Sequence, residues 1–378
     1  MRPRVGGLPR WAAVAVLPAL NIAAALFIGG LVVLAIGESP LDAVAIMLRG
    51  AFGSAEGFGF TLYYATNFIF TGLAVAVAVH GGLFNIGGEG QAYVGGLGAT
   101  LVVLALDTVL PGIVVLPLAV LAAALLGAAW AFVPAWLQAR RDSHIVITTI
   151  MFNFLASALM VYLLVNVLGR PDSMAPETRP FNPAGQLPQV HEVAAFLGLA
   201  VAASPLNLAF PLALLAAAGV WVLLWRTRLG YEIRTVGHSP TAAAYAGIRP
   251  SRIVVIVMLI SGALAGLMAA NEILGVQQRL LLDFPAGAGF VGIAVALMGR
   301  SHPMGVVLAA ILFGALYQGG AELAFDVPAI TRDMIVVIQG LVILFAGALE
   351  HLFARPLALA LGPFRAGRGT AGAGAAAP

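Results

Sequence analysis

The chain has 378 residues, of which 61% are hydrophobic and 9% are charged, and its mean hydropathy is +1.01. Soluble domains carry about 25% charged residues, so most of this chain is predicted to lie in a membrane, and the net charge of +3 gives no basis for nucleic-acid binding. The sequence contains neither cysteine nor lysine, which excludes disulfides, thiolate metal sites and a P-loop ATPase.

Long apolar windows predict an all-α, polytopic integral membrane protein with about ten transmembrane helices. The third and eighth helices are short for a span, so one or two helices are predicted to be broken or re-entrant. The expected helices cover residues 12–36, 60–80, 91–106, 113–137, 144–168, 207–225, 252–273, 287–299, 304–322 and 331–350.

Arginine positions predict the orientation of these helices. With ten crossings and both termini in the cytoplasm, most arginines fall on the cytoplasmic side, as positive-inside topology requires. The first helix is read as uncleaved, because its apolar run lacks a small-residue cleavage site before Glu38. The expected parts are a cytoplasmic N-terminus at 1–11, a membrane domain at 12–350 and a cytoplasmic tail at 351–378 with a disordered end.

Two polar loops interrupt the predicted membrane domain. The loop at 169–206 is proline-rich and is expected outside the cytoplasm, with a short surface helix near 191–202. The loop at 226–252 is flanked by arginines and is expected inside. Within it, Ser239-Pro240 is a helix-start signal, and four alanines before Gly247 favour a two-turn helix that could dock on a soluble partner. A plain solvated loop is the alternative.

The segment 81–92, G-G-L-F-N-I-G-G-E-G-Q-A, combines five glycines with two amides and a carboxylate between apolar runs. Irregular backbone at membrane depth is tolerated only where protein buries it or where it lines a wet path, and ionisable groups there usually face a cavity or a partner. The topology places the start of this segment near the cytoplasmic end of the second helix, unless the segment folds back into the membrane.

A second glycine-rich stretch, 284–305, contains Gly287, Gly289 and Gly292 and includes the turn G-R-S-H-P. Its small residues allow either tight helix packing or a site. The pair Asn271-Glu272, near the outer end of the seventh helix, is interpreted as solvated at the interface; the alternative is that it faces a binding partner or the entrance of a path.

The segment 81–92, the loop at 226–252 and the stretch 284–305 resemble, in that order, signatures of one protein family. It is the family of branched-chain amino acid and ribose-type permeases, and the resemblance is to its ABC importer permeases of the nucleoside and simple-sugar group. The resemblance rests on G-L-F-N-I-G-G-E-G-Q at 82–91, on R-T-V-G at 234–237 followed by 242–248, and on 289–303. It covers about residues 10–350, and the first block is the form usual in the larger permease subunit of nucleoside importers.

The resemblance implies a permease that pairs with a second permease subunit, as a homo- or heterodimer, within membrane lipid. An extracytoplasmic solute-binding protein would deliver the solute, and two cytoplasmic ATP-binding-cassette ATPase domains would drive transport. The loop at 226–252 would then carry the coupling helix. The residues expected at the ATPase contact are Glu232, Arg234, Gly237, Ala244, Tyr245, Ala246 and Gly247.

Five side chains are candidates for the substrate path. Each also has a structural interpretation, because a carboxylate or amide can satisfy free backbone groups, and asparagine often joins helices within membranes. They are Asn67, Asn85, Glu89, Gln91 and Asn153.

The sequence therefore predicts a multi-pass permease of the bacterial cytoplasmic membrane that carries nucleosides and needs no cofactor or metal of its own. A simple-sugar permease is the alternative within the family. An ion-coupled secondary transporter is the alternative from another class, although Glu89 is the only well-placed intramembrane acid for it. A membrane-embedded enzyme would need a convergent catalytic set, which the sequence lacks.

Overall fold

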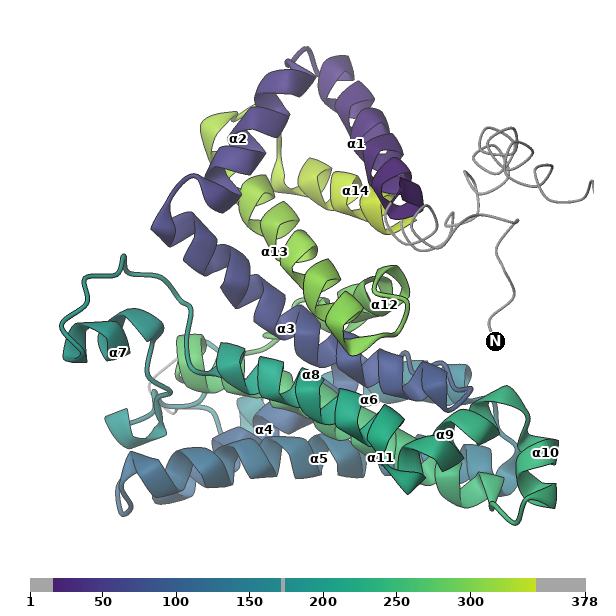
Figure 1. Cartoon of the computed structure of the whole chain (residues 1–378). Helices are drawn as coiled ribbons and strands as arrows, with labels where there is room; N and C mark the ends of the chain where they lie inside the picture. The colour runs from purple at the N-terminus through teal and green to yellow at the C-terminus, as the bar shows by residue number, and fades with distance from the viewer. Residues whose placement is uncertain (1–15, 171–173, 345–378) are drawn as a thin grey trace, which may run out of the picture. The chain divides into compact units, whose positions relative to one another are not determined.

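The computed structural model describes residues 16–170 and 174–344 (Figure 1). Over these residues the regular structure is helical, with two isolated bridges, Glu177 to Leu281 and Gln189 to Asn207, as the only strand-like pairs. The all-α prediction is confirmed. The expectations for residues 1–11 and 351–378 lie outside the described residues, as does the end of the tenth predicted helix. The chain divides into two compact units, residues 1–45 with 323–378 and residues 46–322.

The first unit contains α1 (Leu17–Ala35), the start of α2 (Pro40–Phe52) and α14 (Arg332–Ile343). Gly29 of α1 lies against Ile338 of α14, where a methyl group would come within 3.2 Å of the isoleucine side chain. The chain bends by 117° between α1 and α2, so the two are one broken span or a re-entrant pair. Helix α2 was not predicted, although Ser39-Pro40 is the same helix-start signal that predicted the helix at 240.

The second unit holds the rest of α2 and the remaining helices, except the last turn of α13, which belongs to the first unit. They are α3 (Ala55–His80), α4 (Gly88–Leu106), α5 (Gly112–Arg141), α6 (Ile145–Asn166), the single turn η3 (Pro183–Gly185), α7 (Val190–Phe196), α8 (Ala209–Arg226), α9 (Arg228–His238), α10 (Pro240–Tyr245), α11 (Pro250–Ala269), its π-helical continuation η4 (Ala270–Gln277), α12 (Ala288–Met298) and α13 (Pro303–Asp326).

The core of this unit lies where α3, α4, α5 and α11 pack together. In the most apolar window of α3, 83% of residues are buried, against 22% for α5 and for α6, so α3 is central while α5 and α6 expose most of their surface. The buried face of α5 is a stripe of small residues at every fourth position, including Ala119, Ala123 and Gly127. Gly262 and Gly266 of α11 meet this stripe backbone to backbone, because no side chain separates the helices.

Seven described helices are long and apolar enough to cross a membrane, and the bent α1–α2 pair raises this number to eight. Each of the ten predicted stretches contains a helix. The difference from ten arises mainly because α12 has only 11 residues, as its short apolar run predicted, and because α14 is described over 12. The polytopic membrane architecture is thus confirmed, and the eighth predicted helix, at 287–299, is the short helix α12.

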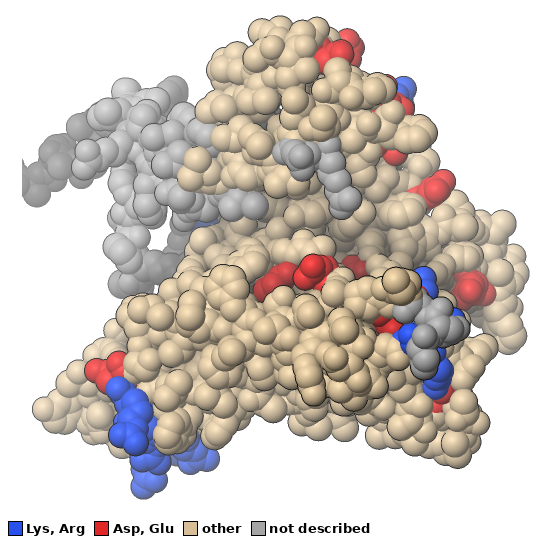
Figure 2. Space-filling model, turned by 180° about the vertical axis from the view of Figure 1, so that it is seen from behind, with Lys and Arg blue, Asp and Glu red and all other residues tan. Residues whose placement is uncertain are grey.

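Basic side chains gather at one end of the second unit, around α9 and α10 (Figure 2). We call this the arginine-rich end. It comprises the last turns of α5 and α8, all of α9 and α10 and the first turn of α11, with Arg140, Arg141, Arg226, Arg228, Arg234, Arg249 and Arg252.

Candidate functional site

The segment between α3 and α4 folds back into the helix bundle. It leaves α3 at His80, at the arginine-rich end, and its first turn is closed by the Leu83 N–H, which donates to the Ala78 carbonyl at 3.0 Å. Helix α4 then begins at Gly88, so residues 88–92 are helical and only 81–87 are irregular, which corrects the predicted start at residue 91.

Asn85 fixes this re-entrant segment. Its Nδ2 donates to Gln91 Oε1 and to Ser261 Oγ, both at 2.8 Å, and its Oδ1 accepts from the Gly87 N–H at 2.8 Å. Ser261 in turn donates to the Ala74 carbonyl at 2.7 Å. Asn85 and Gln91 are both 1% exposed. Their side chains bond to each other, and Asn85 also bonds to the Ser261 hydroxyl and the Gly87 N–H.

Glu89 joins the starts of two helices. Its two carboxylate oxygens each accept a backbone N–H at 2.7 Å, one from Gly287 and one from Gly289, at the beginning of α12. Because a helix N-terminus carries a partial positive charge, it stabilises this half-buried carboxylate. A methyl group on Gly289 would overlap the backbone of Glu89 and lie 2.7 Å from the Gly88 carbonyl carbon, so only glycine permits this approach.

The junction lies level with the second half of α3. Gly292, one turn into α12, packs on Thr71, which is nine residues and therefore about 14 Å along α3 from His80. Residues 278–287 lead from the opposite end, where the Gln278 carbonyl accepts from the Phe181 N–H in the loop between α6 and α8. Helices α4 and α12 thus both begin inside the bundle, and the chain reaches them from opposite ends.

Asn153 of α6 holds the same segment from the other side. Its Oδ1 accepts from the Gly90 N–H at 2.9 Å and its Nδ2 donates to the Ile86 carbonyl at 3.0 Å. Four of the five predicted path residues, Asn85, Glu89, Gln91 and Asn153, therefore gather around the start of α4. We call this set the α4 junction.

The fifth, Asn67, belongs to a second buried polar cluster. Asn67 Nδ2 and the Tyr63 hydroxyl both donate to Glu272 Oε1 at 2.6 Å. Asn271 donates to Asn67 Oδ1 at 2.8 Å and accepts from Asn207 at 3.0 Å. The acid and its neighbour lie in the π-helical turn η4, a type of distortion that is frequent at functional sites.

The interpretation of Asn271 and Glu272 as solvated is wrong, because they are 0% and 6% exposed. The sequence held a signal that was missed: an amide and an acid side by side in an apolar helix are expensive to insert and usually mark a partner or a path. Their partners on α3 are more than 200 residues away in sequence, so the pairing itself could not be read from local pattern.

The short helix predicted to start at Ser239-Pro240 is present as α10. Ser239 caps it by accepting from the Ala242 N–H, Pro240 starts it, and Gly247 follows it with a left-handed φ of +79°. Ala244, Ala246 and Gly247 are exposed, and Tyr245 is 91% exposed.

The other predicted coupling residues lie on α9, which was not predicted as a helix. Glu232 pairs with Arg228 at 3.0 Å, and Arg234 Nε donates to the Gly230 carbonyl at 3.4 Å; both predicted residues are half-buried. Gly237 packs against the α3–α4 turn at Gly82, which links the α9–α10 segment directly to the re-entrant loop.

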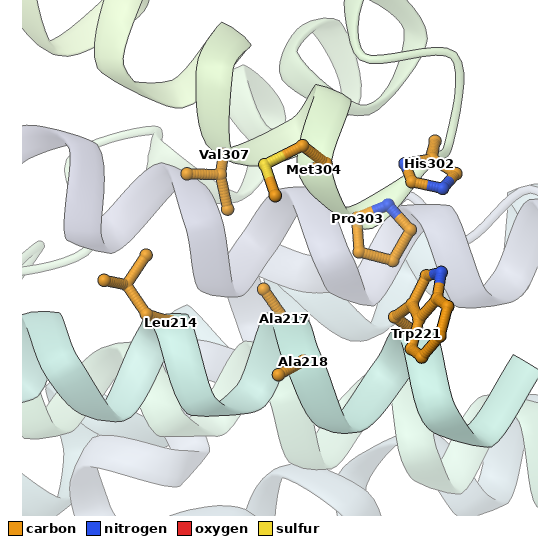
Figure 3. A pocket seen from close by; sticks show the side chains of 8 residues that line it. All are labelled: Leu214, Ala217, Ala218, Trp221, His302, Pro303, Met304 and Val307. Atoms are coloured by element: carbon orange, nitrogen blue, oxygen red, sulfur yellow. The ribbon is translucent and has the colours of Figure 1, made fainter.

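An apolar crevice of about 380 Å³ lies between α8 and the first turns of α13 (Figure 3). None of the residues that line it belongs to the α4 junction or to the Glu272 cluster. It is therefore a separate feature of the second unit.

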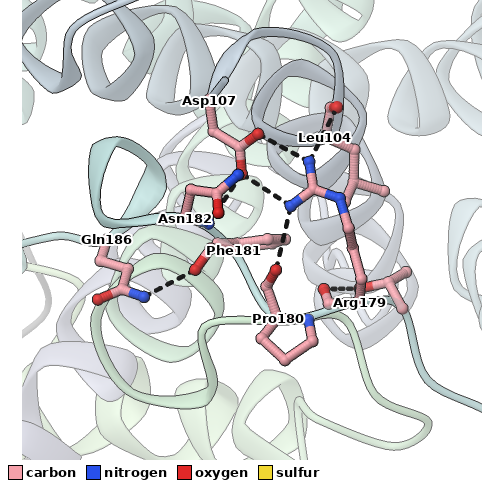
Figure 4. Close-up of polar contacts among 8 residues, drawn as sticks. Leu104, Asp107, Arg179, Pro180, Phe181, Asn182 and Gln186 are labelled. Atoms are coloured by element: carbon pink, nitrogen blue, oxygen red, sulfur yellow. Dashed lines mark hydrogen bonds and ion pairs between the residues drawn. The ribbon is translucent and has the colours of Figure 1, made fainter.

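The loop between α6 and α8 is tied down at the end opposite the arginine-rich end. Arg179 donates to the Asp107 carboxylate through Nη2 at 2.7 Å and through Nη1 at 3.0 Å, and the Asn182 N–H donates to the same carboxylate at 2.9 Å (Figure 4). Burial disfavours ionisation, but these bonds outweigh it and hold the pKa of Asp107 below its ordinary value of 3.8. The hydrogen bonds with Asp107 raise the pKa of Arg179 above its ordinary value.

Comparison with known proteins identifies relatives over most of the chain. Residues 57–347 match the family described as the permease component of branched-chain amino acid transport systems. The chain is 36% identical over 340 residues to the glucose ABC transporter permease protein TsgB13 of Haloferax volcanii, which covers 89% of this chain and 88% of that protein.

The guanosine ABC transporter permease protein NupP of Bacillus subtilis is 37% identical over 336 residues, 88% of this chain and 92% of its own length. The nucleoside ABC transporter permease protein NupB of Lactococcus lactis is 31% identical over 333 residues, 87% of this chain and 89% of its own. No solved structure matches the chain significantly.

Proposed function

Since the chain belongs to the permease family of branched-chain amino acid transport systems, we propose that it forms the translocation path of an ATP-binding-cassette importer for nucleosides. The observation that carries the proposal is the α4 junction, where α4 and α12 begin beside the half-buried Glu89 inside the helix bundle. Polar groups and irregular backbone are tolerated there only inside protein or along a wet path, which is what a polar solute requires.

The chain itself is not an enzyme, because its family supplies the membrane component and its sequence has no P-loop lysine. We assign ATP hydrolysis to two cytoplasmic ATP-binding-cassette domains that contact α9 and α10. The exposed Ala244 and Tyr245 support this assignment, because a short capped helix with an exposed aromatic side chain suits a groove on a soluble partner. A second permease subunit and an extracytoplasmic solute-binding protein complete the proposed assembly.

The proposed orientation places the arginine-rich end and both termini in the cytoplasm of a bacterium. The concentration of arginines around α9 and α10 supports it, because positive residues near membrane spans favour the cytoplasmic side. The loop at 169–206, tied down by Asp107 and Arg179, then faces the binding protein.

Simple sugars are the second candidate solute, because the glucose permease is as similar to the chain as the guanosine permease. A nucleoside contains a pentose, so hydroxyl recognition serves both classes. The ion-driven alternative has no support among the relatives, whose names identify them as ABC transporter permeases.

Reconstituted transport tests the proposal. The complete transporter in proteoliposomes, supplied with its binding protein, should take up labelled guanosine only when ATP is present. Labelled glucose serves as the second arm, and a thermal-shift screen of the binding protein with nucleosides, sugars and branched-chain amino acids identifies the solute independently. Uptake driven by a proton gradient without ATP or binding protein would overturn the importer assignment; uptake of glucose alone would overturn only the nucleoside.

The path can be tested separately, because the chain has no cysteine and any introduced thiol is unique. Phe290, beside the α4 junction, is 48% exposed, and Leu101, on the outer surface of α4, is 45% exposed. In the assembled transporter a membrane-impermeant thiol reagent should label Phe290→Cys, and added guanosine should protect it. Leu101→Cys is the matched control and should not react. Equal labelling of both variants would contradict a solute path at the junction.

A further inference from the structure

The crevice between α8 and α13 is lined mostly by apolar side chains, together with His302. His302 and Trp221 lie at its rim (Figure 3), and the Arg226 guanidinium lies over the Trp221 ring, 5.2 Å from its centre. Leu214, seven residues along α8 from Trp221, lies about 10 Å farther from the arginine-rich end. The interior is completed by aliphatic side chains of α13.

The rim is at the level of the membrane interface. Trp225 contacts the rings of His80 and His302, with ring centres 5.2 and 5.1 Å apart, where α3 ends and α13 begins. Tryptophan favours the headgroup region of a bilayer, and Arg226 is the last residue of α8. The crevice therefore runs from the headgroup level into the hydrocarbon level.

The surface around the crevice is apolar and exposed. Met304 and Leu308 of α13 are each 63% exposed, and Leu215 of α8 is 69% exposed. Apolar residues exposed at this depth contact acyl chains, and the crevice opens through the same surface. A chain from an adjacent lipid can enter it without desolvating any polar group, and the volume is in the range of small-molecule pockets.

We propose that this crevice binds a phospholipid with an anionic headgroup from the leaflet at the arginine-rich end. One acyl chain occupies the space beside Leu214 and Val307, and the headgroup phosphate lies beside Arg226 and His302. The charge complementarity at the rim selects the lipid, because a basic residue next to a gap between membrane helices attracts anionic headgroups. This site goes beyond the proposed solute path and does not depend on which solute is carried.

Photo-cross-linking in the complete transporter tests the site. Nanodiscs of phosphatidylcholine would contain a small, equal fraction of either phosphatidylglycerol or phosphatidylcholine with a diazirine in its acyl chain. Peptide mass spectrometry should find adducts on residues 214–221 and 303–308. The phosphatidylglycerol probe should give about fivefold more adduct there than the phosphatidylcholine probe, the preference expected from one arginine at an anionic surface.

Two variants separate the acyl and headgroup contributions. Ala218 is an exposed residue of the crevice wall, so Ala218→Trp should fill the space and remove most adducts. Leu215→Trp, on the neighbouring outer surface, is the matched control and should leave the adducts unchanged. Arg226→Gln should keep the acyl adducts but reduce the headgroup preference to near one.

Three outcomes would overturn the site. They are equal adducts from both probes in the wild type, adducts that survive Ala218→Trp, and cross-links between the crevice and another protein chain in place of lipid. The wild-type comparison and Arg226→Gln decide the question even if Ala218→Trp does not assemble. Loss of guanosine uptake with intact lipid adducts would count against the proposed function and leave the lipid site standing.

Discussion

Glu89 is the residue whose role the structure changes most. Its carboxylate is a candidate solute contact by sequence, yet both of its oxygens accept backbone N–H groups at the start of α12. Hydrogen bonds to a charged group contribute about 1.5–3 kcal/mol each to stability. The two bonds of Glu89 hold the starts of α4 and α12 together. Glu89 therefore supports the shape of the proposed path before it contacts any solute.

We expect Glu89→Gln to lower the free energy of unfolding by about 2 kcal/mol, because an amide has one oxygen and no charge for two N–H donors. Thermal unfolding of the solubilised transporter, measured beside uptake per folded molecule, checks this. Uptake and folded protein should fall together. Glu56→Gln is the control, since Glu56 also lies in a first helical turn but is exposed. Lost uptake from fully folded protein would instead assign the carboxylate to the solute.

The Asp107–Arg179 pair makes a pH-dependent anchor for the loop between α6 and α8. The pKa of Asp107 is lowered in the folded state, so its stabilisation is complete above about pH 4 and is lost as the pH falls through that lowered value. Because the pKa of Arg179 is raised above its already high ordinary value, Arg179 stays charged at alkaline pH and the pair persists there.

Limited proteolysis of the loop at 169–206 should therefore accelerate below pH 4, and Asp107→Asn should produce the same exposure at pH 7. The expected cost is about 1.5 kcal/mol, the lower end for charged hydrogen bonds, because the Arg179 side chain is 38% exposed. Glu177→Gln, which removes the single-bond pair with Arg279, is the comparison and should have a smaller effect. A loop equally protected in Asp107→Asn would contradict the anchor.

At the scale of elements, the glycines set how closely the helices approach. Gly289 lets α12 begin against the backbone of α4, and Gly262 and Gly266 let α11 lie against α5. Such contacts replace side-chain packing where lipid supplies no hydrophobic drive between helices. The α4 junction exists only because its glycines leave room for it.

Gly289→Ala should therefore destabilise the permease by about 1–3 kcal/mol or displace α12, because the new methyl group overlaps the Glu89 backbone. Gly219→Ala on α8 is the matched control: it meets no atom within 4 Å and should be neutral or slightly stabilising. The yield of monodisperse protein after heating measures both. Equal yields for the two variants would show that α12 does not start at this position in the membrane.

At the scale of the whole molecule, the α9–α10 segment connects the proposed ATPase contact to the α4 junction. Gly237 of α9 packs on the turn at Gly82 that begins the re-entrant loop. A displacement of α10 by the ATPase domains would reach the loop through this contact, as a rigid-body movement of packed helices. The exposed helix α10 and the α4 junction thus lie in the same unit and are connected through the contact between Gly237 and Gly82.

Ala244→Arg should uncouple uptake from ATP hydrolysis, because Ala244 is exposed on α10 while its neighbour Ala243 is buried. The variant should insert normally, and uptake should fall about tenfold or more while ATP hydrolysis persists. Ala244 is a better test than Gly247, whose left-handed backbone would strain any side chain. His144→Arg, exposed at the α5–α6 turn, is the control. Unchanged uptake in Ala244→Arg would refute the coupling assignment.

Local pattern was enough to find the parts of the site that lie within one segment. The glycines of 81–92, the capped helix at 240 and the shortness of α12 follow from residue types at short spacing, and all three are present. Local pattern failed for Asn271 and Glu272, which it placed in solvent. Their burial depends on Tyr63 and Asn67, and no short-range signal reports a partner two hundred residues away.

The sequence alone determined that this is a helical membrane protein of a permease family without an ATPase site, because hydropathy, missing lysine and short motifs are local properties of the chain. Only the tertiary structure decided that the Gly-rich segment folds back into the helix bundle and that Glu89 bridges two helix starts. Both depend on Gly88 and Gly289 meeting across 200 residues of sequence, and such contacts form when packed helices bring distant backbone together.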